Sequence, residues 1–162
     1  MICMIQRLPR VLGCLLLLAA CRTAFEQPSQ IAASSARLIE CYGQVQARHG
    51  AGGYQTARIG ETLLPGDGLK TGANSRAQLA IGGNQFVRLD QNSQVLVTHV
   101  QQDGLTSFKT LVGGVWVTIQ KALGVPTKFE VQTPSVTAGA RGTIFRCEVS
   151  DDGETGVYVY EG

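Results

Sequence analysis

Short runs in which apolar and polar residues alternate fill the chain from residue 37 onward, and this alternation constrains the fold more than any other feature. A period of two places successive side chains on opposite faces of an extended strand, and no stretch here shows the 3.6-residue period of an amphipathic helix. Turn-forming residues separate the runs, as expected between short strands. The breaks are GGN (82–84), DQN (90–92), DG (103–104), GG (113–114) and DDG (151–153).

This pattern predicts an all-β fold in a single domain. A parallel α/β fold needs a helix of ten or more residues between strands, and the runs leave no room for one, so the strands are expected to be mostly antiparallel. Residues 37–162 make about 125 residues, the size of one ordinary domain. The pattern is compatible with a twisted sandwich or roll and with a solenoid-like arrangement, but no fixed repeat motif demands a strict repeat solenoid.

The first 20 residues have the layout of a secretory signal peptide. Arg7 and Arg10 precede the apolar run VLGCLLLLAA (11–20), and this segment contains no acidic residue. A helix that crosses a bilayer needs about 20 apolar residues, so the run is too short to span one and is expected to be removed.

Cys21 follows this run directly, and LAAC (18–21) resembles the lipobox of bacterial lipoproteins. In that family the cysteine thiol receives a diacylglyceryl group, and the cysteine becomes the acylated N-terminus. An ordinary cleavage site beside a chance cysteine is the alternative, but the small residues Ala19 and Ala20 favour lipidation. Several acyl chains anchor a protein stably in a membrane. Arg22, by resemblance to enterobacterial sorting, favours the outer membrane.

Residues 21–36 are small and polar and are expected to form a flexible tether between the lipid and the domain. The protein is therefore predicted to face the periplasm from the cell envelope. Removal of Arg7 and Arg10 from the 14 Lys and Arg leaves 12 basic against 12 acidic residues, so the mature net charge is zero. A nucleic-acid partner, which calls for a clustered basic face, is not expected.

The sequence offers no catalytic or metal-binding constellation. His49 and His99 lie far apart and have no Cys or His neighbour at ligand spacing. Ser107 and Ser135 lie outside a G-x-S-x-G setting. Asp67 lies beside glycine, which is typical of a residue that caps a turn. We expect no enzyme activity, no cofactor and no metal.

The stretch TPSVTAGARGTIFRCEV (133–149) is predicted to be a corner between two strands. Pro134 lacks an N–H group, so the run KFEVQT (128–133) must end or reach a sheet edge there. Gly142 permits a positive φ, and the five donors of the Arg141 guanidinium are expected to bind the carbonyls of the broken ladder. An anion-binding site around Arg141 is the alternative.

A half-buried strand is expected to follow this corner. Thr143, Phe145 and Cys147 fall on one of its faces, and Arg146 and Glu148 fall on the other together with Ile144.

The pattern F-x-V-x-T-P followed by R-G-T-x-F, here FEVQTP (129–134) and RGTIF (141–145), resembles the signature of the FecR domain. GETLLPGDGLKTGANSRAQLAIGGNQFVRLDQNSQVLV (60–97) is similar to the earlier half of that family, and LVGGVWVTI (111–119) to its L-x-x-G-x-V hairpin. The resemblance covers about residues 38–162. The motif residues carried over are Thr133, Pro134, Arg141, Gly142, Thr143 and Phe145.

The resemblance implies a β-domain related to periplasmic sensors that relay signals to a cytoplasmic sigma factor. Those sensors have a membrane-spanning helix, whereas the only long apolar run here resembles a cleaved signal, so we expect a free-standing lipoprotein-like member. The family continues past V-x-V-x-E-G with another strand, so residues 37–162 are expected to form the domain without its last strand. The function that the resemblance implies is non-enzymatic binding of a protein or glycan partner in the envelope, with signalling as one use of that binding. The alternative is a purely structural envelope lipoprotein.

A disulfide between Cys41 and Cys147 is a further prediction. Once the signal is removed and Cys21 is lipidated, these are the remaining thiols, and the compartment favours oxidation. Two buried cysteines that form no bond are the alternative, because spacing in sequence says nothing about geometry.

Overall fold

The computed structural model describes residues 35–102, 104–120 and 128–161, and all regular secondary structure in them is β-strand. The predicted all-β, single-domain fold is therefore confirmed. The signal peptide, Cys21 and nearly all of the tether lie outside the described residues, so these three assignments stay predictions. No helix in the described ranges is long and apolar enough to cross a membrane.

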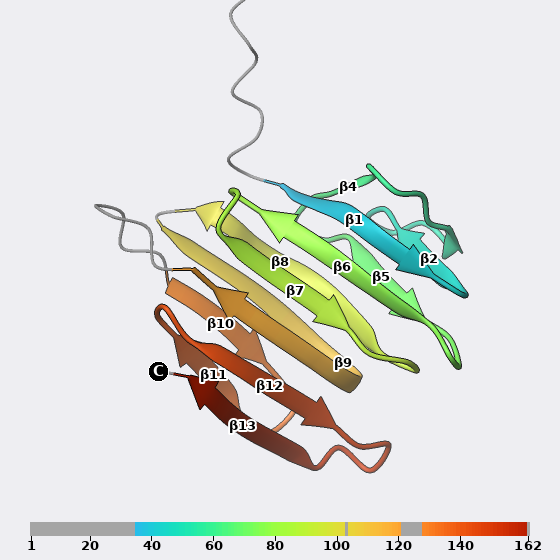
Figure 1. Ribbon diagram of the computed structural model, residues 1–162. Coiled ribbons are helices and arrows are strands. Elements are labelled where there is room, and N and C mark those ends of the chain that lie inside the picture. Colours follow the sequence, from blue (N-terminus) through green and yellow to red (C-terminus); the bar gives the residue numbers. More distant parts are fainter. Residues whose placement is uncertain (1–34, 103, 121–127, 162) are drawn as a thin grey trace, which may run out of the picture.

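The strands form one continuous sheet that curls so that its two halves lie face to face (Figure 1). We call the halves sheet A and sheet B. Sheet A contains, in spatial order, β4 (Thr62–Leu63), β1 (Ala36–Tyr42), β6 (Arg76–Ile81), β7 (Gln85–Leu89), β9 (Leu105–Ile119), β12 (Ile144–Val149) and β13 (Thr155–Glu161). Sheet B contains β3 (Gln55–Thr56), β2 (Val45–Arg48), β5 (Gly68–Thr71), β8 (Gln94–Gln102), β9 again, β10 (Lys128–Gln132) and β11 (Thr137–Ala140).

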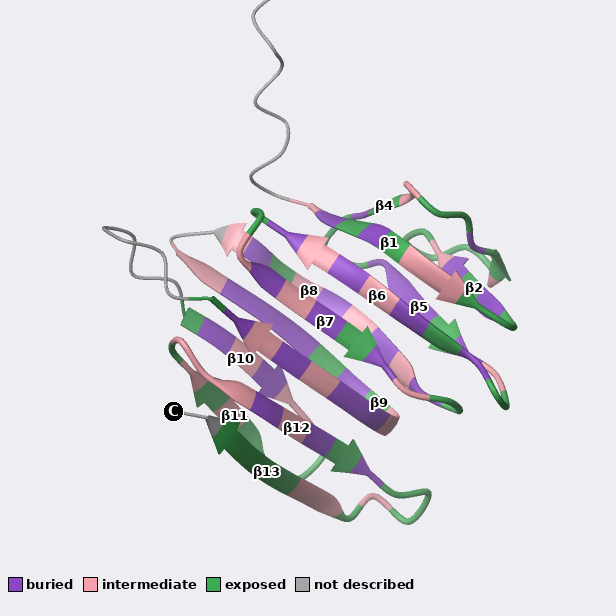
Figure 2. Ribbon diagram, viewed as in Figure 1, coloured by how far each residue is buried: buried purple, intermediate pink, exposed green. Residues whose placement is uncertain are grey.

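Most pairs are antiparallel, as expected, and the exception is the parallel pair of β9 and β10. The rolled arrangement buries the inward-facing residues of both halves against each other. Figure 2 shows the resulting stripes of buried and less buried residues along most strands of sheet A. The core contains Leu38, Leu79, Leu89, Val117 and Phe145 from sheet A and Leu69, Val95, Val97, Phe108 and Phe129 from sheet B.

Strand β9 joins the two halves. Its first part, up to Val112, pairs with β8 and β10 in sheet B, and the part from Gly113 onward pairs with β7 and β12 in sheet A. The sequence predicted a turn at Gly113–Gly114, and that prediction is wrong. The chain bends here without reversing, because Gly113 has a φ of 87° that redirects an otherwise extended strand.

The stretch 133–149 is a corner, as predicted. Strand β10 ends at Gln132, and a turn closed by the Thr133 N–H and the Val136 carbonyl (2.8 Å) leads into β11. Residues 141–143 then carry the chain from β11 in sheet B to β12 in sheet A. Gly142 has the predicted positive φ, 58°.

Backbone groups and a threonine, not the arginine, hold this corner. The Thr143 hydroxyl donates to the Arg141 carbonyl (2.9 Å), and the Ile119 N–H donates to the Thr143 carbonyl (3.1 Å). The Arg141 side chain is exposed and donates no hydrogen bond to any residue that the structure describes. Its predicted role in pinning broken carbonyls is therefore wrong, because Thr143 already supplies the local donor. Beyond the corner Phe145 and Cys147 are buried, as predicted.

The predicted disulfide between Cys41 and Cys147 is absent, and both cysteines are free. The register gives the reason. Cys41 and Cys147 lie at β1 and β12 on one row of the inner face of sheet A, with three strands between them. This inner row consists of Cys41, Ala77, Leu89, Val115, Cys147 and Val157. Strands lie about 4.8 Å apart, so four spacings separate the cysteines by about 19 Å, whereas the Cα atoms of a disulfide lie about 4.4–6.8 Å apart.

Candidate functional site

The outer face of sheet A carries a row of large polar and aromatic side chains that crosses six strands. The pairing of neighbouring strands fixes this row, since directly paired residues point to the same side of a sheet. We call it the outer row, and its members are Glu40, Gln78, Arg88, Trp116, Arg146 and Tyr158. It lies on the opposite face from the inner row of cysteines and aliphatic residues.

Trp116 is the centre of the outer row. The Tyr160 ring stacks on it with the ring centroids 4.7 Å apart and an interplanar angle of 21°. The guanidinium carbons of Arg88 and Arg146 lie 5.1 and 5.5 Å from the indole centroid, within the range of cation–π attraction. The indole Nε1–H donates to Asp90 (3.2 Å). Four neighbours therefore fix the orientation of the tryptophan.

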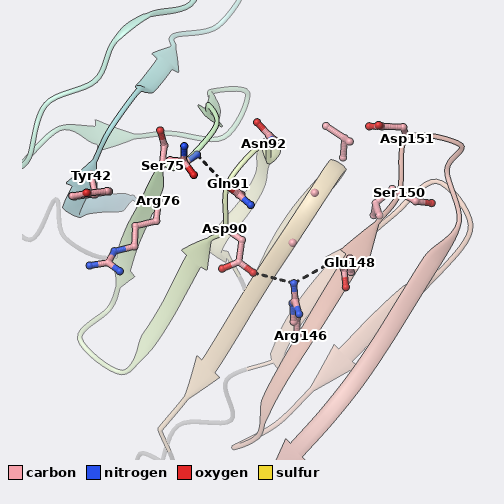
Figure 3. Close-up of a pocket in the computed structure, with 15 residues that line it drawn as sticks. Tyr42, Ser75, Arg76, Asp90, Gln91, Asn92, Arg146, Glu148, Ser150 and Asp151 are labelled. Carbon is pink, nitrogen blue, oxygen red and sulfur yellow. Dashed lines mark hydrogen bonds and ion pairs between the residues drawn. The ribbon is translucent and has the colours of Figure 1, made fainter.

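Arg146 lies between two carboxylates (Figure 3). Its Nη2 atom is 3.2 Å from Asp90 Oδ2 and 3.4 Å from Glu148 Oε1. The backbone of Asp90 is fixed as well, because its N–H donates to the Gly114 carbonyl (2.9 Å) and its carbonyl accepts from the Thr71 hydroxyl (2.6 Å). The pairs with Asp90 and Glu148 hold the guanidinium at the base of an open groove.

The groove has a volume of about 660 Å³ and lies where the ends of β1, β6, β7 and β12 meet the bend of β9. A second cation, Arg76, lines it beside Tyr42, with the guanidinium carbon 5.4 Å from the ring centroid. Arg76 is also paired with Glu40 (2.8 Å). Gly114 forms part of the floor, and a Cβ there would lie 2.8 Å from the Asp90 carboxylate. The surface thus combines arginine, carboxylate and tyrosine groups within reach of one partner.

Most of the charged side chains that line the groove are engaged in ion pairs. Arg146 is paired with Asp90 and Glu148, and Arg76 is paired with Glu40, whereas Asp151 forms no ion pair with another described residue. The described part of the chain also contains no group of three or more His, Cys, Asp or Glu side chains that is placed to hold a metal ion.

His49 makes contacts that the sequence did not reveal. Its Nδ1 atom is 2.9 Å from Asp67 and its Nε2 atom is 2.8 Å from Glu61. Hydrogen bonds to Asp67 and then to Glu61 raise the pKa of His49. Burial alone raises the pKa of Asp67, but hydrogen bonds from the Leu64 N–H, from His49 and from the Gly50 N–H outweigh it, so this pKa is lowered. Asp67 caps a turn, as predicted.

The motif residues at the corner do not contribute to the groove. The hydroxyls of Thr133, Ser135 and Thr155 form a hydrogen-bonded chain that ties the β10–β11 turn to the start of β13. Arg141 borders a separate open groove with Lys128 and Glu130. The anion-binding alternative for Arg141 remains a hypothesis.

Sequence reasoning placed Arg146 and Glu148 on the outward face of their strand but did not connect them with Trp116 or Asp90. The signal available was the type of residue at outward positions, since Trp, Arg and Tyr alternate with apolar residues in VWVT, FRCE and VYVY. Their juxtaposition depends on the register between distant strands, which no local pattern gives.

A protein-family model matches the chain. The family model described as "FecR protein" matches residues 67–162, more than half of the chain. No curated protein and no solved structure matches significantly.

Proposed function

The chain belongs to the FecR family, and from this premise we propose that it is a non-enzymatic, lipid-anchored envelope protein that binds a partner protein through the groove beside Trp116. Proteins of the family are associated with the envelope and periplasm and regulate signalling there; they are regulators and not enzymes. The lipid anchor, the partner and the surface that binds it are parts of the proposal.

The composition of the outer row and groove carries the proposal. Trp, Tyr and Arg are the residue types enriched at the energetic centres of protein–protein interfaces. Here Trp116, Arg146 and the exposed Tyr158 follow one another along the outer row. The exposed ring of Tyr42 lines the groove on the same face of the sheet, beside Arg76. The position of Arg146 between two carboxylates favours a partner of mixed charge over a polyanion.

A protein partner fits the groove better than a glycan does. Sugar rings stack on exposed aromatic faces, but the Trp116 indole is already engaged by Tyr160 and two guanidinium groups. Other lining side chains are amides, which make directional polar contacts: Asn74, Asn92 and Gln91, whose Oε1 atom accepts from the Asn74 N–H (3.0 Å).

The anchor would hold this domain at a membrane surface. We assign lipidation to Cys21, and the outer membrane to the mature protein, from the LAAC sequence and the residue that follows it. A tether that begins at Cys21 and ends before Ala36, the first residue of β1, would leave the groove free to meet a partner in the periplasm.

A photo-crosslinking amino acid at Tyr42, whose side chain is 61% exposed at the groove, tests the site in living cells. We expect a crosslinked product that contains a second polypeptide. Ile59 is 67% exposed and does not line the groove, so the same amino acid at Ile59 is the matched control and should give no such product. Arg88→Glu in the outer row should abolish the product, and Arg37→Glu, an exposed arginine outside the outer row, should not.

The nature of the product decides between the readings. A product degraded by protease but not by a glycan hydrolase supports a protein partner, and the reverse result would show that the partner is a glycan. If the crosslinking amino acid at position 42 gives neither a protein product nor a glycan product, the groove is not a binding site. A purely structural envelope lipoprotein is then the better description.

A further inference from the structure

Strand β13 is an edge that nothing among the described residues covers. It pairs with β12 and with no other described strand. The backbone N–H and C=O groups along its other side are therefore available to a further strand. Such an edge is usually blocked by lysine, by proline or by an early bulge. Residues 155–160 contain no charged residue and no proline, and the pairing with β12 is regular from Thr155 to Val159.

The row of apolar residues on the inner face continues from β12 onto β13, although its members are buried on β12 and exposed on β13. On β12, Phe145 and Cys147 are 2% and 0% exposed. Their direct partners on β13, Val159 and Val157, are 66% and 40% exposed. Exposed valines that continue a buried row indicate a surface that a neighbouring strand would cover.

We propose that β13 pairs antiparallel with β13 of a second copy of this chain, about a two-fold axis at Val157. Full pairing of the regular part, Thr155 to Val159, requires this axis because Val157 is its middle residue. Each Val157 then lies opposite its copy, and Val159 lies opposite Thr155, so apolar and β-branched side chains cover the exposed inner face.

The same axis avoids the costs that usually prevent self-pairing. Glu161 falls opposite Gly153 and Glu154 opposite Tyr160, so no two like charges meet. On the outer face Tyr158 lies opposite Gly156, so no two bulky side chains are directly paired there. The sequence of β13 is thus complementary to itself, which favours a second copy over a foreign peptide strand. The proposal is independent of the groove and of its partner.

Sedimentation equilibrium of the full-length protein tests the pairing, with Val157→Lys as the first variant. We expect a wild-type mass that rises with concentration to that of two chains. Two lysines at the axis would face each other, so the dimer dissociation constant should rise about tenfold or more. Val136 is 42% exposed in the β10–β11 turn, and Val136→Lys should leave association unchanged.

Mixing Val157→Lys with Val157→Glu distinguishes a second copy from any other occupant. Only on a two-fold axis do the two substituted positions face each other, so the mixture should regain dimers that neither variant forms alone. Val159→Lys, at the most exposed valine of the strand, should also weaken the dimer. It replaces Val157→Lys in the sedimentation experiment if that variant does not fold.

Three results would overturn the proposal. The first is a wild-type mass of one chain at every concentration, and the second is a mixture of the two Val157 variants that stays monomeric. The third is a monomer that co-purifies with a foreign polypeptide lost in Val159→Lys, because that result would assign the edge to a partner strand.

Discussion

A Cβ atom on Gly113 would lie 2.5 Å from the Cα atom of Ser93 and 2.7 Å from the Asn92 carbonyl oxygen. This approach fixes the bend at which β9 passes from one half of the sheet to the other. Ser93 adds to it, since its Oγ atom accepts from the Gly114 N–H (3.0 Å) and donates to the Gly114 carbonyl (3.1 Å). Gly113→Ala should therefore destabilise the domain by roughly 3 kcal/mol, the sum of a positive-φ penalty and a clash with backbone.

Gly83→Ala separates these two contributions. Gly83 also has a positive φ, 79°, but nothing lies within 4 Å of the Cβ position there. Gly83→Ala should therefore lower the free energy of unfolding by only about 1 kcal/mol, because alanine disfavours the positive φ. Thermal unfolding of the two variants measures the difference, and equal melting temperatures would show that the approach of β9 to Ser93 is not rigid.

Within a single strand, the sequence predicts which residues face inward and which face outward. Alternation in TIFRCEV places Phe145 and Cys147 inside and Arg146 outside, because the side-chain period of a strand is two whatever its neighbours are. The turn at Asp67 follows from local hydrogen bonding in the same way.

The bend at Gly113 could not be predicted, because a Gly-Gly pair permits either a reversal or a bend and only the packing of Ser93 selects between them. Register is the second limit. Arg88, Trp116 and Arg146 belong to strands joined by connections of different length, so their shared row is a property of the assembled sheet. The same limit produced the incorrect disulfide, since no local signal reports that three strands separate Cys41 from Cys147.

The corner after β11 gives a prediction that separates its glycine from its arginine. Gly142 has a φ of 58°, which a β-branched side chain strongly disfavours, so Gly142→Val should cost about 2 kcal/mol or more. Arg141 is exposed, so Arg141→Ala should change the free energy of unfolding by less than about 0.5 kcal/mol. Denaturant unfolding measures both, and a large loss for Arg141→Ala would restore the arginine to a structural role.

The two thiols should remain free and differ in reactivity. Burial raises the pKa of Cys147 to about 11, and burial together with Glu61 and Glu40 raises the pKa of Cys41. Thiolates are the reactive form, so both should label slowly in the folded protein. Cys41 should label first because it is only partly buried. In unfolded, unreduced protein both should label fully, and an absence of labelling there would show that a bond had formed.

Stability should fall as pH rises through the raised pKa of His49. Asp67 and Glu61 bind the protonated ring in the folded state, so the contribution is complete below the ordinary pKa of about 6.5 and is lost as pH rises from there through the raised pKa of the folded state. His49→Gln should therefore lower the melting temperature most near pH 5–6 and least above neutral pH. The His49 side chain is 57% exposed, so the effect should be small and should shrink in 1 M salt. His99→Gln, at an exposed position on β8, controls for the loss of a histidine as such.

Lipidation of Cys21 is the prediction on which the location of the protein depends. Four features agree on it: two arginines at the start, an apolar run too short to span a bilayer, small residues at positions 19 and 20, and a cysteine directly after them. Intact-mass spectrometry of protein extracted from membranes should show a mature chain that begins at Cys21 and carries acyl groups. Cys21→Ala should leave the precursor uncleaved or processed at another residue, and the domain should then lose its membrane attachment, since several acyl chains provide it. An unmodified N-terminus at any other position of the wild-type protein would contradict the prediction, whereas the folded domain of residues 37–162 would be unaffected by that result.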